Sequence, residues 1–257
     1  MIDAEDVSRH RILQLATHLL DRPIAEITPA MFSEGSFTKS DIADVIEGHH
    51  FGVEKNNRTG PDFTETGIEL KVTPLGTNAS GRIIRPKERL VISAIDYEAI
   101  AANEDWDAVA GISGKLDPVL IIWYDASADD RSRHRVVWVA LWRPTRAQSE
   151  QMQADYEQLR SRVLAGERLS GSDGEFLSSC PRHAGGWDED PAIADQGSIV
   201  GSHPTLDHAQ RRAWQIKPRG MTDVLAEATD LPIVDRPARG VETDALYDAL
   251  DERAGSI

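Results

Sequence analysis

The chain has 257 residues, 40% of them hydrophobic, and a formal net charge of −15. This length and apolar content allow a folded core, which excludes intrinsic disorder as the default state. The single cysteine, Cys180, excludes an intrachain disulfide framework and a cysteine-based zinc site, and it fits a reducing compartment. The sequence begins without a signal-peptide pattern, and no stretch approaches the roughly 20 apolar residues of a membrane helix. We therefore expect a cytoplasmic protein without a membrane anchor.

The acidic balance bears on nucleic-acid binding, because proteins usually contact phosphates through a basic surface. A net charge of −15 argues against such a surface. Net charge, however, describes solubility and long-range steering, and a cleft can carry a local field of its own. A bound metal ion also adds positive charge that the formula does not count. The composition therefore weakens a DNA-binding hypothesis and does not exclude it.

The first part of the chain predicts two helices. Apolar residues at helical spacing indicate one helix at 7–20. A second helix is expected to start near Ser40 and to stop in the region 48–52, where glycines and histidines follow the apolar stripe. The polar stretch 54–60 is rich in charges and turn formers, and it predicts an exposed connection.

The rest of the chain predicts several strands and two further helices. Strands are indicated by β-branched and aromatic residues between turn formers, and the long helix by an apolar stripe that ends at Gly166. In chain order we expect strands at 68–72, 90–95, 119–124 and 136–142, a helix at 148–165, loops around a short strand within 170–195, a strand at 213–217 and a helix at 222–228. This order favours an α/β fold with a mixed central sheet flanked by helices.

The stretch 62–71 contains three charged residues, Asp62, Glu69 and Lys71, whose spacing suggests a catalytic group. In a strand at 68–72, Glu69 and Lys71 point to one face, while the apolar residues between them point to the core. Asp62 lies just before, across a turn at Gly67 that would bring it back beside Glu69. Two carboxylates suit Mg²⁺, and a nearby ammonium can orient a water or offset developing charge. The pattern predicts metal-assisted phosphodiester hydrolysis. The alternative is an ordinary solvated face with weak ion pairs.

The residues around this constellation resemble the MutH family of endonucleases, which contains a mismatch-repair enzyme and type II restriction enzymes that cut at GATC. The spacing of the aspartate, the glutamate and the lysine is that of the family. The matching stretches are 60–63, 67–74, Lys39 with Glu47 on the second expected helix, Lys115-Leu116, 174–177 followed by Pro181-Arg182, and 214–218. The resemblance covers roughly residues 7–228, and it implies an endonuclease domain at 1–228 with an acidic tail or appended helix at 229–257.

The resemblance implies a restriction-endonuclease-like PD-(D/E)xK fold and an enzyme that cuts double-stranded DNA to 5′-phosphate and 3′-hydroxyl ends. Its cofactor would be Mg²⁺, with Mn²⁺ as a substitute. Its roles carry over to residues of this chain as follows: Asp62 and Glu69 as metal ligands, Lys71 as the charge-stabilising lysine, Glu47 and Lys115 as further active-site residues, and Lys39, Arg182 and Gln215 as DNA contacts. Cys180 and Gln215 depart from the family, whose member carries an arginine and a tyrosine there, and this leaves the target sequence open.

Three functions stay open on the sequence. The first is a type II restriction enzyme that cuts at a GATC-related site, with a cognate DNA methyltransferase as its companion. The second is a mismatch-repair nicking enzyme switched on by a MutL partner. The third is a DNA-binding module that has lost catalysis, against which the intact Asp62, Glu69 and Lys71 argue. We expect a monomer, or a dimer formed transiently on DNA.

A basic run follows the constellation, formed by Arg82, Arg85, Lys87 and Arg89. It is explained equally well as a solvated face and as a group of phosphate contacts.

Overall fold

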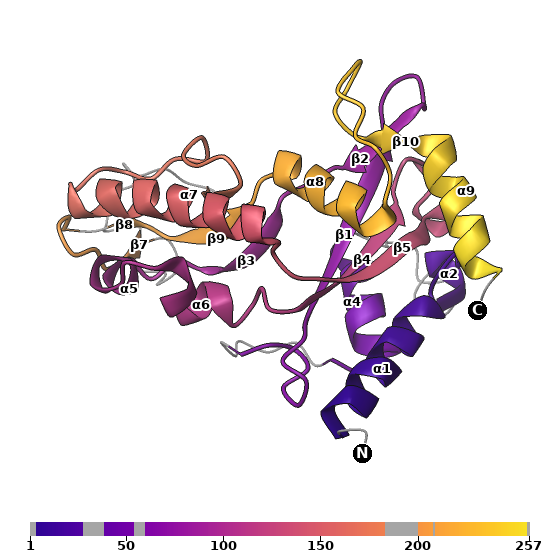
Figure 1. The fold of residues 1–257 in the computed structure, drawn as a ribbon, viewed down its shortest axis with the longest axis horizontal. Coiled ribbons are helices and arrows are strands. Elements are labelled where there is room, and N and C mark those ends of the chain that lie inside the picture. The colour runs from indigo at the N-terminus through magenta and orange to yellow at the C-terminus, as the bar shows by residue number, and fades with distance from the viewer. Residues whose placement is uncertain (1–3, 28–38, 54–59, 183–199, 208, 256–257) are drawn as a thin grey trace. The chain divides into compact units, whose positions relative to one another are not determined.

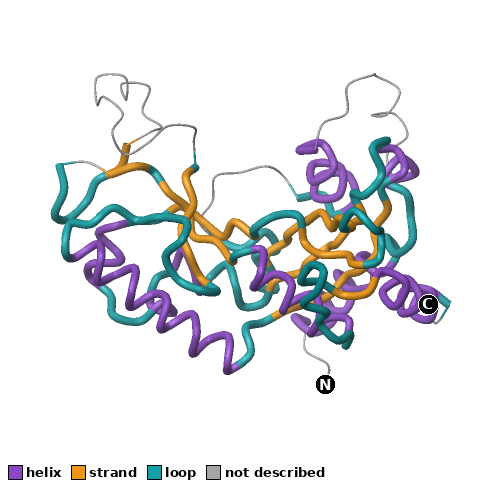
Figure 2. Tube along the Cα trace, turned by 90° about the horizontal axis from the view of Figure 1, so that it is seen from above, coloured by secondary structure: helices purple, strands orange, loops and turns teal. Residues whose placement is uncertain are grey.

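The computed structural model describes residues 4–27, 39–53, 60–182, 200–207 and 209–255. The chain forms two compact units, each built from separate segments of the sequence (Figure 1). Unit 1 comprises residues 1–88, 117–143 and 221–257, and unit 2 comprises residues 89–116 and 144–220. Both units combine strands with helices (Figure 2), which confirms the mixed α/β class. No helix in the described ranges is long and apolar enough to cross a bilayer.

Unit 1 is built on a five-stranded mixed sheet with the strand order β10-β2-β1-β4-β5. Its strands are β1 (Glu69–Thr77), β2 (Ile83–Pro86), β4 (Val119–Asp125), β5 (Arg135–Trp142) and β10 (Val241–Glu242). The central pair β1 and β4 is parallel, and the other neighbours are antiparallel. Residues 119–124 are all buried, as expected for a strand covered on both faces. The strand expected at 68–72 is confirmed, and it continues to Thr77.

Helices pack around this sheet. They are α1 (Ala4–Thr17), α2 (Ile24–Ile27), α4 (Lys39–Asp44), the π-helix η1 (Val45–His50), the short η3 (Arg131–Arg133), α8 (Pro218–Thr229), which enters the unit at Met221, and α9 (Thr243–Ala254). Helices α1 and α9 contact β5, and α4 and η1 contact β1. The two N-terminal helices expected from the sequence are thus confirmed. The π-helical second half of the second one was not predicted, because apolar spacing over six residues does not distinguish α from π.

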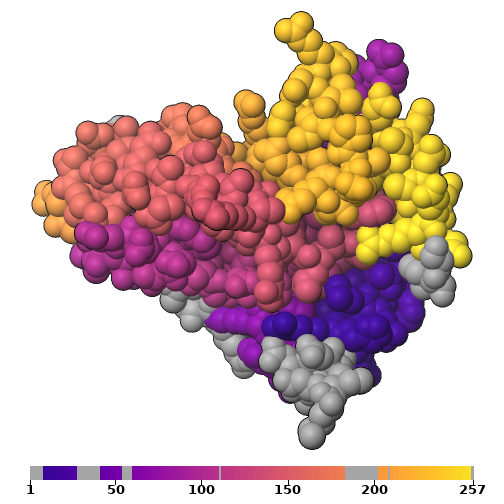
Figure 3. All heavy atoms as spheres, in the orientation of Figure 1, coloured from indigo at the N-terminus to yellow at the C-terminus, as the bar shows by residue number. Residues whose placement is uncertain are grey.

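The C-terminal stretch contributes a strand and a helix to unit 1. Strand β10 pairs with β2 at the edge of the sheet, and α9 follows at once. Tyr247 on α9 donates a 2.6 Å hydrogen bond to Asp125, and the guanidinium of Arg253 lies 4.5 Å from the ring centre of Trp138. In the space-filling view, the orange and yellow residues of the C-terminal part form a continuous region of the surface (Figure 3). The segment after residue 229 therefore takes part in the packing of this unit.

Unit 2 is built on a three-stranded antiparallel sheet with the order β3-β9-β6. Its strands are β3 (Leu90–Ala94), β6 (Leu177–Pro181) and β9 (Arg212–Ile216), with a separate pair formed by β7 (Val200–Gly201) and β8 (Ala209–Gln210). Its helices are α5 (Tyr97–Ala102), η2 (Trp106–Ala108), α6 (Ala110–Ser113) and α7 (Arg146–Leu164). Thr145 and Gln148 form a capping box at the start of α7. Gly166, at φ +70°, ends it as expected.

Candidate active site

A tight turn brings Asp62 to the beginning of β1. The Phe63 amide donates to the Ile68 carbonyl at 2.9 Å, and Gly67 adopts a φ of 69° that suits glycine. The turn brings the Asp62 carboxylate beside β1, where its Oδ2 accepts a 2.9 Å hydrogen bond from the Leu70 amide. Asp62 is thereby held beside the strand residue that separates Glu69 from Lys71.

Glu69 and Lys71 form an ion pair on β1. Lys71 Nζ lies 2.5 Å from Glu69 Oε1, as the strand alternation predicts for residues on one face. The Glu69 side chain is only 2% exposed, whereas that of Lys71 is 25% exposed. The pair is therefore no solvated surface contact, because the Glu69 carboxylate is shielded from water and the loss of the Lys71 charge beside it would cost stability.

Glu47 shares the electrostatic environment of this group. Burial raises the pKa of its carboxyl to about 7, the charges of Asp62 and Glu69 act in the same direction, and Lys71 opposes them. Glu47 lies in the π-helix η1, in which the Phe51 amide bonds to the Ile46 carbonyl at 3.2 Å. π-helical turns often occur at functional sites. The structure thus gathers Glu47, Asp62, Glu69 and Lys71 from two elements of unit 1.

Contacts away from the carboxylates hold these two elements in place. The rings of Phe51, just after η1, and Phe63, just after Asp62, meet edge to face at 5.8 Å. Helix α1 contacts both elements. Arg9 donates to the Thr66 carbonyl at 3.2 Å, and His50 Nε2 lies 2.7 Å from the Leu15 carbonyl. The relative position of the carboxylates therefore depends on α1 as well as on β1.

The donor set fits a hard divalent cation. Asp62 and Glu69 offer carboxylate oxygens, and Mg²⁺ needs only one or two carboxylates because it retains waters. Burial is the main cause of the raised pKa of Glu47, the neighbouring carboxylates add to it, and a bound cation would oppose both effects. Within the described ranges, no three His, Cys, Asp or Glu side chains lie close enough together to hold a metal by themselves. A metal here would thus complete its coordination with water and substrate oxygens.

The raised pKa of Glu47 predicts a pH-dependent stability. The folded carboxyl titrates near 7 and the unfolded one near 4.5, so the folded state binds more protons between these values and loses stability as the pH rises through them. In metal-free buffer at pH 8, Glu47→Gln is expected to raise the Tm by roughly 2–4 °C, the shift that about 1 kcal/mol produces in a protein of this size. Thermal unfolding from pH 4 to pH 8 checks this. A difference that does not shrink toward pH 4 would contradict the assignment to Glu47.

The remaining expected site residues lie on other segments of the chain. Lys115, Arg182 and Gln215 lie in unit 2, and the side chain of Lys39, the first residue of α4, is outside the described part. Arg182 is exposed directly after β6, with its amide bonded to the Arg211 carbonyl at 3.1 Å. Gln215, in contrast, is buried within β9. Cys180 is buried in β6.

Asp155 is a residue with a positioning role that sequence reasoning missed. It is buried on α7, and its carboxylate accepts hydrogen bonds of 2.7, 2.7 and 2.8 Å from the amides of Glu175, Phe176 and Leu177. It therefore fixes the start of β6, the strand that leads to Arg182. The available signal was an aspartate on the apolar stripe of a helix, next to Tyr156, because such a carboxylate needs partners.

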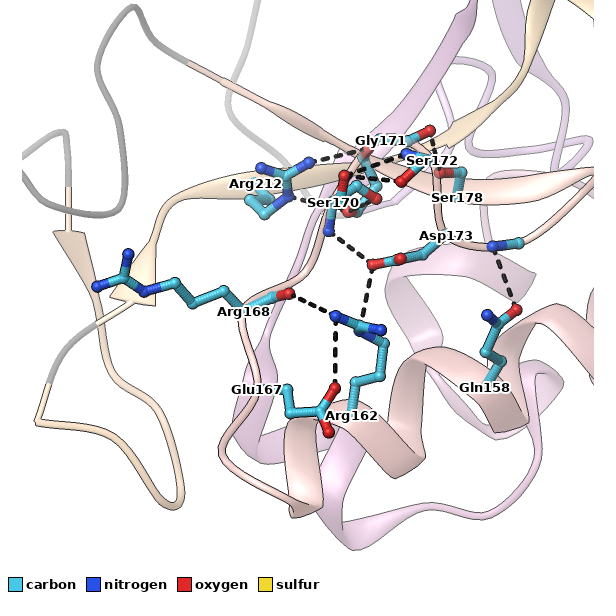
Figure 4. Close-up of polar contacts among 12 residues, drawn as sticks. Gln158, Arg162, Glu167, Arg168, Ser170, Gly171, Ser172, Asp173, Ser178 and Arg212 are labelled. Carbon is cyan, nitrogen blue, oxygen red and sulfur yellow. Dashed lines mark hydrogen bonds and ion pairs between the residues drawn. The ribbon is translucent and has the colours of Figure 1, made fainter.

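The loop between α7 and β6 is ordered by a second polar network (Figure 4). Asp173 accepts a 2.6 Å hydrogen bond from the Ser170 amide and lies 3.5 Å from the guanidinium of Arg162. Arg162 also lies 3.4 Å from Glu167 and donates to the Arg168 carbonyl. Together with Asp155, this network gives β6 a defined direction within unit 2.

Comparison with known proteins bears on the segment that holds the carboxylates. Residues 51–155 match the profile of the family described as MutH, DNA mismatch repair enzyme MutH. The type II restriction enzyme Sau3AI of Staphylococcus aureus is 27% identical over 194 residues, which are 73% of this chain and 37% of Sau3AI. The DNA mismatch repair protein MutH of Shewanella amazonensis is 27% identical over 169 residues, 65% of this chain and 72% of that protein.

A third relative, the MutH protein of Haemophilus influenzae, is 26% identical over 156 residues, which are 60% of this chain and 67% of that protein. The chain thus spans most of the length of these two MutH proteins and little more than a third of Sau3AI. Asp62, Glu69 and Lys71 all lie inside the segment that matches the profile. The resemblance seen in the sequence is confirmed: residues 51–155 of this chain match the MutH family.

Proposed function

We propose that the chain is a Mg²⁺-dependent endonuclease that hydrolyses phosphodiester bonds of double-stranded DNA to 5′-phosphate and 3′-hydroxyl ends. The observation that carries this proposal is the grouping of Asp62, Glu69 and Lys71 with Glu47 at the start of β1. The similarity of the segment 51–155 to MutH supports it. In this proposal the mixed sheet of unit 1 is the core of a restriction-endonuclease-like fold, and the enzyme acts in the cytoplasm.

Each residue of the group has a proposed role. Asp62 and Glu69 hold the cation, and Glu47 lies within electrostatic reach of both carboxylates and assists the site. Bound Mg²⁺, or Mn²⁺ in its place, polarises a phosphate and lowers the pKa of a coordinated water. Lys71 holds Glu69 in position and presents an ammonium that offsets the negative charge developing on the scissile phosphate.

Residues outside this group contact the substrate in the proposal. Lys115 contacts the scissile phosphate, and Lys39 and Arg182 are further DNA contacts. Arg182 is suited to base recognition because it is exposed, follows a well-anchored strand, and carries a guanidinium that can pair with guanine. Gln215 contributes through the sheet of unit 2.

We propose a type II restriction enzyme that cuts at a GATC-related site and acts with a cognate methyltransferase. The similarity to Sau3AI, which extends over 73% of the chain, favours this role. The similarity to MutH over 65% of the chain favours a second candidate, a nicking enzyme activated by a MutL partner. The enzyme binds DNA as a monomer or a transient dimer.

Incubation of unmethylated plasmid with the protein tests the proposal. With Mg²⁺ we expect linear fragments whose sequenced ends share one motif, and with EDTA we expect intact plasmid. Nicked circles that appear only when MutL is added would favour the mismatch-repair candidate. Intact plasmid under every condition, with Mg²⁺ or Mn²⁺ and with or without MutL, would overturn the endonuclease proposal.

A further inference from the structure

The amide group of Gln215 is fully engaged inside unit 2. Its Nε2 donates to the Ser179 carbonyl at 3.1 Å, and its Oε1 accepts from Arg89 Nη1 at 3.3 Å. The orientation of the amide is fixed by chemistry, because a carbonyl only accepts and a guanidinium only donates. Gln215 is 3% exposed, so it presents little surface to a ligand. Its role in this arrangement is to join β6 to the side chain of Arg89.

Arg89 is the exposed member of this chain of contacts. Arg89 directly precedes β3 and is exposed. Among the residues that the structure describes, no carboxylate forms an ion pair with it. A guanidinium has five N–H donors, and a single one is used on Gln215. The buried acceptor holds one edge of the planar group, and the other donors are left for a ligand. This differs from an ordinary solvated arginine, whose head group is not fixed by a buried partner.

A second arginine lies in the same sheet without a carboxylate partner. Arg212 is 4% exposed and donates to Ser179 Oγ, to the Ser179 carbonyl and to Gln210 Oε1, all of them neutral acceptors. Burial lowers the pKa of its guanidinium and the charge of Arg89 acts in the same direction, whereas Tyr97, Cys180 and Asp173 oppose them. Two cations therefore lie within electrostatic reach of each other in a chain whose net charge is −15. Such a pair is stabilised when an anion binds.

We propose that Arg89 binds a backbone phosphate of the DNA and that Gln215 is its positioning residue, with buried Arg212 adding to the local positive potential. This inference rests on the proposed function, which supplies duplex DNA as the ligand. A backbone phosphate is the anion that a bound duplex offers at every sequence, and a guanidinium pairs with it through two parallel hydrogen bonds.

Equilibrium binding in EDTA separates this contact from catalysis. Two fluorescent duplexes of equal length are titrated over a series of salt concentrations, one with the sequence mapped from the cut ends and one without it. We expect Arg89→Ala to bind both duplexes on the order of tenfold more weakly than the wild type. The slope of log affinity against log salt should fall by about one, the signature of one lost phosphate contact. Arg146→Ala is the matched control, because Arg146 is 92% exposed in unit 2 and pairs with Glu150.

Gln215→Leu tests the positioning role. It removes the acceptor for Arg89 but leaves the Ser179 carbonyl bonded to Arg212, so the sheet keeps that contact. We expect affinity to fall severalfold while the salt slope stays at the wild-type value, because the charge of Arg89 remains. Arg89→Lys should likewise keep the slope. Thermal unfolding of each variant checks that unit 2 is folded.

The outcomes distinguish this inference from the proposed function. If the wild type binds and cuts DNA but Arg89→Ala behaves like Arg146→Ala, the phosphate contact is refuted and the endonuclease stands. A loss confined to the mapped sequence would mean that Arg89 reads a base, which also overturns the assignment. A wild-type protein that neither binds nor cuts any duplex refutes both.

Discussion

Asp62→Ala is expected to bind duplex DNA like the wild type and to cut it on the order of a thousandfold more slowly or not at all, because it removes a carboxylate proposed to hold the metal. The Asp62 side chain also accepts a hydrogen bond from the Leu70 amide. Asp62→Asn keeps an oxygen acceptor for that amide but is a weaker ligand for a hard cation. We therefore expect both variants to lose cleavage and the asparagine variant to retain more stability.

Single-turnover cleavage of plasmid in Mg²⁺ measures this effect, and binding in EDTA checks that the DNA interface is intact. The matched control is Glu65→Ala, which removes an exposed carboxylate from the same turn and should cut normally. A single-turnover cleavage rate within tenfold of the wild-type rate for either Asp62 variant would contradict the assignment of Asp62 as a metal ligand.

Lys71→Met should slow single-turnover cleavage by about a hundred- to a thousandfold, the usual cost of losing one preorganised electrostatic contact. The substitution keeps most of the side-chain stem. It also removes an ammonium that lies 2.5 Å from the carboxylate of Glu69, whose side chain is 2% exposed. We expect the free energy of unfolding to drop by about 1–3 kcal/mol, less than for a fully buried pair because Lys71 is partly exposed. Metal affinity should be unchanged or improved.

A double variant separates the two effects of Lys71. Glu69→Gln combined with Lys71→Met removes both charges of the pair, so stability should return toward the wild-type value, whereas cleavage stays lost because Glu69 is also a proposed metal ligand. Chemical denaturation and single-turnover kinetics give the two quantities. A Lys71→Met enzyme that loses less than tenfold in rate would show that Lys71 acts only as a structural partner of Glu69.

The sequence by itself determined the local geometry around the constellation. Alternation along a strand puts Glu69 and Lys71 on one face, and a glycine before the strand permits the turn that returns Asp62. The buried strand at 119–124 and the long capped helix were equally predictable. All of these depend on spacing over a few residues, where backbone geometry leaves few alternatives.

Only the tertiary structure decided which distant residues meet. The sequence suggested Gln215 as a DNA contact, whereas in the fold its side chain bonds to Arg89, 126 positions away. The environment that raises the pKa of Glu47 depends on α4, η1 and β1 folding together, and neither the π-helical turn nor strand β10 left a periodic signal. Burial and desolvation arise from packing between elements, and spacing along the chain does not report which elements pack. The sequence therefore predicted which residues carry the chemical groups, whereas the residues that these groups contact could be identified only from the fold.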